Sequence, residues 1–278
     1  MESFNLTYRS STINYQKAGH GGKILFCFHG YDESSSSFAF LEESLVDAYT
    51  MLAIDLPFHG KTIWNEGLSL RPEDLLQIVE EILKDQNIKQ VRFQLAGYSM
   101  GGRLALSLLE LVPGKIEKIF LFSPDGLVMN GWYWLAVHNR LGSRLFEYTM
   151  RHPGWFFRMM DFTRRIGLSN RSIYKFAKSS IEKPEERELL YKRWTCMAPS
   201  RPDLKKIKSL ILAHPIFVEL IYGRFDRIIR YSRGEEFRKG IETQSRLTIL
   251  DAGHQLLQAR WLDQIAPLFD RSMNHSDH

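Results

Sequence analysis

One short segment reads Gly97-Tyr98-Ser99-Met100-Gly101-Gly102, and it lies between an apolar run at 91–96 and a helix-like run at 103–111. A serine framed by glycines at such a strand-to-helix turn is lifted above the end of its strand, with its hydroxyl exposed. Glycines flank it because side chains there would collide with neighbouring backbone. The following helix points its positive N-terminal end toward developing negative charge. We therefore predict that Ser99 is a nucleophile.

The competing interpretation is a glycine-rich turn of a nucleotide-binding protein. Such turns carry Gly-x-Gly-x-x-Gly or Gly-Lys-Ser/Thr, and the segment around Ser99 has neither pattern. The sequence therefore favours the nucleophile.

Apolar runs and amphipathic segments alternate along most of the chain. The apolar runs predict strands, and the amphipathic segments predict helices. Strands that alternate with helices indicate a mostly parallel sheet with helices on both faces. The expected strands are 4–8, 12–16, 24–28, 51–54, 91–96, 116–122, 217–222 and 247–250, and the expected helices are 34–48, 72–86, 103–111, 232–239 and 256–269.

A long segment at 127–213 breaks this alternation and reads as several amphipathic helices punctuated by prolines. We expect a core built from residues 1–126 and 214–270, with 127–213 inserted as a helical lid. The polar residues 271–278 are predicted to be a disordered tail.

Length and composition limit the classes of protein to which this chain can belong. A chain of 278 residues suffices for one large α/β domain with an insertion. Cys27 and Cys196 are the two cysteines, and so small a number argues against a disulfide framework. The sequence shows no secretory signal, no membrane-length apolar run and no zinc-ligand spacing. We expect a cytoplasmic protein without a metal or cofactor.

Positive charge is concentrated in one part of the chain, although the net charge is only +5. Residues 128–215 hold 17 Lys and Arg against 7 Asp and Glu, and four of the six tryptophans. A solvated basic face is one interpretation. The others are an arginine that binds a substrate carboxylate, or a patch that attracts an acidic carrier protein or an anionic lipid surface. Nucleic-acid binding is disfavoured, because no recognised binding module is present.

A nucleophilic serine needs a base, and the base needs an orienting acid. In enzymes with this type of turn, the acid and then the histidine follow the serine along the chain. Asp226 comes just after the strand expected at 217–222, and His254 just after the one at 247–250. We predict Ser99, Asp226 and His254 as the catalytic residues, with Asp125 as the rival acid.

An oxyanion needs two positioned N–H donors. The amide of Met100 is one candidate, and the amide of Tyr31, in the loop after the strand at 24–28, is the other. An ordinary turn is the alternative for this loop. We expect His29 to anchor it, and the candidate substrate-binding residues are His29, Gly30, Tyr98, Trp132 and Trp134.

Five motifs in this order resemble the α/β-hydrolase superfamily over about 24–126 and 214–270. They are His29-Gly30, the Asp-x-Pro-x-His-Gly turn at 55–60, Gly97–Gly102, Gly223-x-x-Asp226 and Gly253-His254. The resemblance implies an α/β-hydrolase fold with a helical lid, in the branch of serine esterases and carbon–carbon bond hydrolases. Ser99 argues against the branches with an aspartate nucleophile. Phe58 departs from the pattern, because a small residue is common at its position.

The predicted function is a serine hydrolase that cleaves a carboxylic ester or thioester through an acyl-enzyme, with Tyr31 and Met100 forming the oxyanion hole. Two alternatives stay open. One is carbon–carbon bond cleavage by the same three residues, and the other is a non-catalytic ligand receptor on the same fold. Asp55 and His59 are expected to build a hydrogen-bonded turn rather than to react.

Overall fold

The computed structural model describes residues 1–89, 92–128, 131–165 and 181–271, without the side chains of residues 132 and 165. Several expectations fall outside this description: the predicted tail beyond Arg271, the side chain of Trp132, and the part of the expected lid at 166–180. None of the helices in the described ranges combines the length and apolar character needed to cross a membrane.

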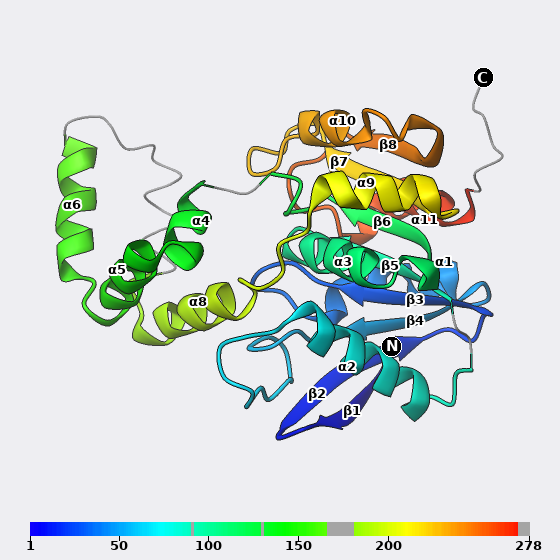
Figure 1. The fold of residues 1–278 in the computed structure, drawn as a ribbon, viewed down its shortest axis with the longest axis horizontal. Coiled ribbons are helices and arrows are strands. Elements are labelled where there is room, and N and C mark those ends of the chain that lie inside the picture. Colours follow the sequence, from blue (N-terminus) through cyan, green and yellow to red (C-terminus); the bar gives the residue numbers. More distant parts are fainter. Residues whose placement is uncertain (90–91, 129–130, 166–180, 272–278) are drawn as a thin grey trace. The chain divides into compact units, whose positions relative to one another are not determined.

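Eight strands form one sheet in the order β1-β2-β4-β3-β5-β6-β7-β8 (Figure 1). The first two strands pair antiparallel, and β2 is antiparallel to β4, whereas the strands from β4 to β8 run parallel. This confirms the predicted mostly parallel sheet. The strands are β1 Glu2–Tyr8, β2 Ser11–Ala18, β3 Lys23–Phe28, β4 Tyr49–Ile54, β5 Phe93–Tyr98, β6 Ile116–Phe122, β7 Phe217–Gly223 and β8 Ser245–Leu250.

Helices cover both faces of this sheet, as expected for central strands that are apolar on both sides. Helices α2, α3 and α9 lie side by side on one face, and α1 and α11 lie on the other (Figure 1). Their bounds are α1 Glu42–Leu45, α2 Pro72–Asp85, α3 Met100–Leu111, α9 Leu204–Ala213, α10 Ser232–Arg238 and α11 Leu262–Asp270.

The helix expected over 34–48 is mostly a 3₁₀-helix, Ser35–Leu41, followed by the four residues of α1. Consecutive serines weaken an α-helix because their hydroxyls compete for backbone hydrogen bonds. The strand expected at 91–96 runs instead from Phe93 to Tyr98, so it ends immediately before Ser99.

The chain divides into two compact units. The first comprises Met1–Glu66, Leu70–Val128 and Pro199–His278, and the second comprises Gly67–Ser69 and Met129–Ala198. The expected insertion extended to residue 213. In the structure, α9 belongs to the first unit, where it buries Ile207 and Ile211.

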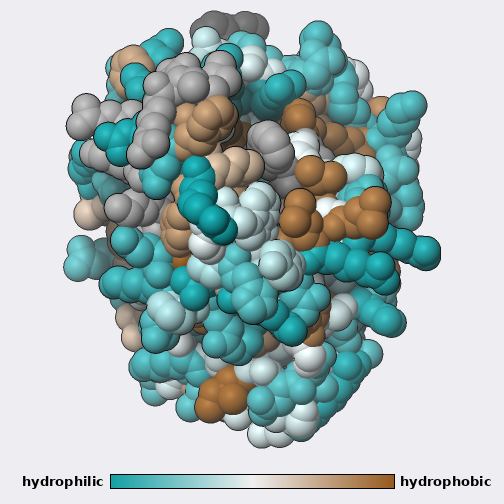
Figure 2. Space-filling view, turned by 90° about the vertical axis from the view of Figure 1, so that its left-hand side faces the viewer, coloured by the Kyte–Doolittle hydropathy of each residue, from teal (hydrophilic) through white to brown (hydrophobic). Residues whose placement is uncertain are grey.

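The second unit contains the helices α4 Gly131–His138, α5 Arg140–Arg151, α6 Gly154–Arg165 and α8 Pro184–Cys196. Tyr133 and Phe146 pack their rings against Trp194 at 5.3 and 5.6 Å between centroids. Other large apolar side chains of this unit lie at its surface. They include Trp134, Leu135, Leu141, Leu145, Tyr148, Met159 and Phe162. On the face drawn in Figure 2, exposed apolar side chains are interspersed with hydrophilic ones.

Candidate active site

Ser99 sits at the turn between β5 and α3, in a backbone conformation with φ 47° and ψ −114°. Non-glycine residues rarely adopt a positive φ, and such strain concentrates at functional sites. A Cβ on Gly97 would lie 2.5 Å from the carbonyl oxygen of Gly101, and one on Gly101 would lie 1.9 Å from that of Phe28. Both positions therefore require glycine, as the sequence predicted.

His254 connects the other two predicted residues. Its Nε2 lies 3.2 Å from Ser99 Oγ, and its Nδ1 lies 2.7 Å from Asp226 Oδ2. Asp226 follows β7 and His254 follows β8, so three strands deliver the three side chains to the carboxyl edge of the sheet. With the proton on Nδ1, the imidazole donates to Asp226 and its Nε2 can accept the serine proton.

The Asp226 carboxylate is fully buried as a side chain. Burial opposes its ionisation, but hydrogen bonds from His254 and from the backbone N–H groups of Ile228 and Ile229 outweigh this effect, so its pKa lies below the ordinary value. The carboxylate therefore stays charged at neutral pH, as an orienting acid must.

Asp125, the rival acid, lies in a different environment after β6. Its Oδ1 accepts the N–H of Gly126 at 2.8 Å, and its Oδ2 lies 3.7 Å from Arg103 Nε. The structure thus pairs Asp125 with an arginine and brings Asp226 to His254.

The loop after β3 leaves the sheet beside the Ser99 turn, because Phe28 on β3 pairs with Gly97 on β5. The residues that carry the predicted oxyanion donors, Tyr31 and Met100, therefore follow the ends of two neighbouring strands. His29 is buried; its Nδ1 lies 2.8 Å from the carbonyl oxygen of Gly30, and its Nε2 accepts the Leu56 N–H at 3.1 Å. Its position is that of a loop anchor.

Tyr98 and Gly30 pack tightly behind the site. A Cβ on Gly30 would lie 2.9 Å from the Tyr98 ring. The Tyr98 hydroxyl donates to the carbonyl of His254 at 3.0 Å, and its ring lies 5.4 Å from the imidazole. Tyr98 is buried, and its hydroxyl binds the backbone of His254. Trp134, another candidate for substrate binding, is 41% exposed in the second unit.

Glu33 is a half-buried residue of the loop after β3 that the sequence reasoning did not single out. It belongs to the same loop as Tyr31, and its Oε2 accepts the N–H of Gly30 at 3.4 Å. Burial raises the pKa of this carboxyl, while hydrogen bonds from Ser37 and Gly30 and the charge of His254 act in the opposite direction.

The turn at 55–60 is structural, in agreement with the expectation. Asp55 accepts the N–H groups of Ser35 at 2.7 Å and Lys61 at 2.8 Å, and the His59 ring lies 4.9 Å from that of His29. Phe58 has φ 65°, a conformation that favours glycine. This explains why a small residue is common at its position.

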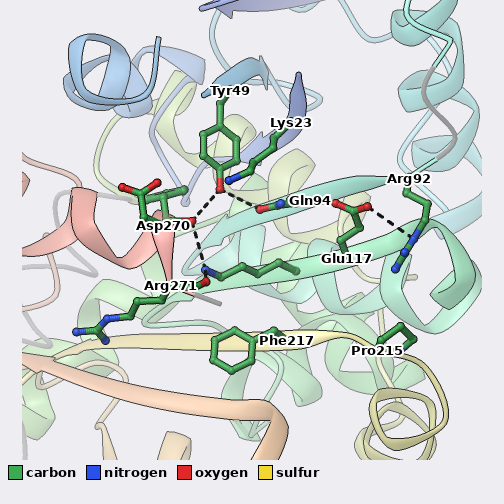
Figure 3. A pocket seen from close by; sticks show the side chains of 11 residues that line it. Lys23, Tyr49, Arg92, Gln94, Glu117, Pro215, Phe217, Asp270 and Arg271 are labelled. Carbon is green, nitrogen blue, oxygen red and sulfur yellow. Dashed lines mark hydrogen bonds and ion pairs between the residues drawn. The ribbon is translucent and has the colours of Figure 1, made fainter. Parts of the chain in front are cut away.

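A separate cavity of about 340 Å³ opens at the amino edge of the sheet, opposite the Ser99 turn (Figure 3). Its lining combines charged and apolar side chains: Lys23 and Tyr49 lie at the starts of β3 and β4, and Phe217 lies at the start of β7. Arg92 Nε lies 3.8 Å from Glu117 Oε1. Among the described residues, no group of three or more His, Cys, Asp or Glu side chains could hold a metal ion there or elsewhere.

Comparisons with known proteins came from sequence and from structure. The sequence profile described as "Alpha/beta hydrolase family" matches residues 24–268. The "Uncharacterized hydrolase YugF" of Bacillus subtilis (strain 168) is 24% identical over 252 residues, which cover 89% of this chain and 88% of the relative. The "Dihydrolipoyllysine-residue acetyltransferase component of acetoin cleaving system" of Pseudomonas putida is 26% identical over 255 residues, or 87% of this chain. The match spans only 61% of that relative's length.

A solved structure has a similar fold. A thermophilic esterase from Thermogutta terrifontis, solved with malate bound, superposes with a TM-score of 0.67 and 17% sequence identity. The superposition covers 97% of each chain.

Proposed function

This chain belongs to the alpha/beta hydrolase family and is a hydrolase, and from that premise we propose a serine hydrolase that cleaves a carboxylic ester or thioester through an acyl-enzyme. The observation that carries the proposal is the continuous contact from Ser99 Oγ through the His254 ring to Asp226, at 3.2 and 2.7 Å. The strained backbone of Ser99 supports it further.

In the proposed reaction, Ser99 Oγ bonds to the substrate carbonyl carbon while its proton passes to His254 Nε2. Asp226 stabilises the resulting imidazolium. The amides of Tyr31 and Met100 stabilise the tetrahedral oxyanion. The bond to the alcohol or thiol then breaks, and the leaving group takes the proton from His254. Water, deprotonated by the same histidine, hydrolyses the acyl-enzyme and regenerates the Ser99 hydroxyl.

Ser99→Ala tests this proposal directly. We expect loss of nearly all hydrolysis of short p-nitrophenyl esters and loss of labelling by a fluorophosphonate, with the thermal unfolding temperature preserved. Ser36→Ala, which removes an exposed hydroxyl, is the matched control and should change neither readout. Undiminished hydrolysis by the Ser99 variant would refute the mechanism. A wild-type protein that the probe does not label would favour the receptor alternative.

The helical unit at 129–198 is proposed to act as a lid that governs substrate choice. Its support is compositional, because this unit and Gly67–Ser69 together hold 13 Lys and Arg against 6 Asp and Glu. Positive charge of this size favours an anionic acyl group, or an acidic carrier protein or anionic surface that presents the substrate.

A further inference from the structure

The backbone of Ser99 is held by the turn that follows β6. Its N–H donates to the carbonyl of Phe122, the last residue of β6, at 2.9 Å, and its carbonyl accepts the N–H of Asp125 at 2.8 Å. Gly102, in the first turn of α3, donates a second N–H to the same carbonyl at 2.9 Å. These residues all belong to the first unit. The end of β6 and its turn therefore bind both backbone polar groups of a residue whose φ is strained.

The turn after β6 is itself closely constrained. Ser123 has φ 39°, although a residue before proline favours extended backbone. Asp125 Oδ1 accepts the N–H of Gly126 at 2.8 Å, so the side chain of Asp125 fixes the peptide that follows it. A Cβ on Gly102 would lie 2.4 Å from Pro124 Cβ, which leaves no space between this turn and the start of α3. The turn therefore has little freedom to shift relative to the Ser99 backbone.

The Ser99 carbonyl and the Met100 N–H belong to the same peptide group. Because a trans peptide group is planar, its C=O and its N–H point in opposite directions. The Asp125 N–H that binds the Ser99 carbonyl therefore also sets the direction of the Met100 N–H, the proposed oxyanion donor. A hydrogen bond to the C=O of a peptide group also polarises the group, which makes its N–H a stronger donor.

We propose that Asp125 is a positioning residue for the reaction: its side chain fixes the turn after β6, and its backbone N–H holds the Ser99–Met100 peptide so that the Met100 amide faces the oxyanion. This inference rests on the proposed function. It gives Asp125 a part that differs from that of the orienting acid, since its carboxylate faces Arg103, with Oδ2 3.7 Å from Nε, and not the proposed base.

The test compares Asp125→Ala with Asp125→Asn. Both variants lose the charge that faces Arg103, but only alanine also loses the acceptor for the Gly126 N–H. For Asp125→Ala we expect kcat for a p-nitrophenyl ester to fall about tenfold with an unchanged KM, because the oxyanion is absent from the bound substrate. Labelling by a fluorophosphonate, whose phosphoryl oxygen takes the place of the oxyanion, should slow by a similar factor. Asp125→Asn should retain both rates within about twofold.

Stability and NMR separate this role from a merely structural one. Both variants lose the same charge opposite a buried arginine, so their unfolding temperatures should fall by similar amounts. A tenfold loss of kcat that also appears in Asp125→Asn would therefore follow stability and overturn the inference. The NMR readout is independent of turnover: in Asp125→Ala alone, the Met100 N–H resonance should shift and the N–H of residue 125 should exchange faster with solvent.

The two proposals can fail separately. An active, labelled wild type whose Met100 resonance and exchange rate at residue 125 are unchanged in Asp125→Ala overturns the inference. A wild type that neither hydrolyses esters nor is labelled, but shows both changes in Asp125→Ala alone, overturns only the proposed function.

Discussion

Asp226 fixes the tautomer of the proposed base. Its Oδ2 lies 2.7 Å from His254 Nδ1, and Oδ1 is held by two backbone N–H groups, so the carboxylate cannot rotate away from the ring. Replacement by asparagine keeps the shape but offers His254 an amide in place of a carboxylate, which favours the wrong tautomer and removes the charge that stabilises the imidazolium.

We therefore expect Asp226→Asn to lower kcat for a p-nitrophenyl ester about 10³–10⁴-fold, with a smaller change in KM. Steady-state kinetics on the folded variant measures this. Asp125→Asn is the comparison, because Asp125 pairs with Arg103 instead of His254. A large loss in the Asp125 variant and a small one in the Asp226 variant would reverse the assignment of the orienting acid.

Individual residues were predictable where a local pattern demands them. The glycines around Ser99 follow from steric limits within six residues, and the predicted contacts of Asp226 and His254 follow from their places after parallel strands. Glu33 was not predictable in this way. Its hydrogen-bond partner Gly30 packs against Tyr98, and this contact brings together parts of the chain more than 60 residues apart.

Among the secondary-structure elements, β6 and α11 are joined by a buried lysine. Lys118 on β6 donates from Nζ to the carbonyls of Leu268 and Arg271, both at 2.8 Å, at the end of α11. Burial lowers the pKa of Lys118 to about 8, from an ordinary value of 10.5. The folded protein therefore loses this proton at a lower pH than the unfolded chain does.

This difference makes a prediction about stability. Between pH 8 and 10.5 the unfolded chain binds more protons at this site, so the contribution of Lys118 to the free energy of unfolding rises with pH in that window. Relative to Lys118→Met, the wild type should gain on the order of 2 kcal/mol across it. Urea unfolding at several pH values measures the gain.

Lys61→Met, which removes an exposed ammonium, is the matched control. Its free energy of unfolding should differ from that of the wild type by the same amount at every pH. If the free energy of unfolding changed with pH by the same amount in the wild type and in Lys118→Met, the Lys118 ammonium would titrate alike in the folded and unfolded states, and the prediction would be wrong.

Element types were more predictable than their bounds. Continuous apolar runs identified the strands from β3 to β7, because a parallel sheet covered on both faces admits few polar residues. The bounds depended on tertiary contacts: β5 extends to Tyr98 because it pairs with β6 through Tyr98 and Phe122. The segment at 34–48 became mostly 3₁₀-helix for a local reason, its run of serines.

At the scale of the whole molecule, the chain separates charge between its parts. Residues 128–215 carry ten more positive than negative side chains, and the rest of the chain carries five more negative than positive ones. The sequence predicted an inserted segment, but α9, with its own amphipathic pattern, could not be assigned to one unit or the other without the structure.

An uneven charge of this kind acts at long range and is weakened by salt. The effect of this charge can be measured with two esters that have the same leaving group. One of them carries a carboxylate on its acyl chain, and the other does not. If the basic unit attracts the substrate, kcat/KM for the anionic ester should fall several-fold between about 20 and 200 mM salt. The neutral ester should change less than about twofold.

Charge variants can show whether the basic unit causes this difference in salt dependence between the two esters. Arg140 and Arg144 are exposed on α5, and replacing both by glutamine should flatten the salt dependence for the anionic ester without altering turnover of the neutral one. Lys61 and Lys89 are exposed on the first unit and provide a matched pair with the same loss of charge. If both double variants flatten the dependence equally, net charge alone is responsible. If neither does, the arginines form a solvated face, and substrate choice depends on shape and apolar contact.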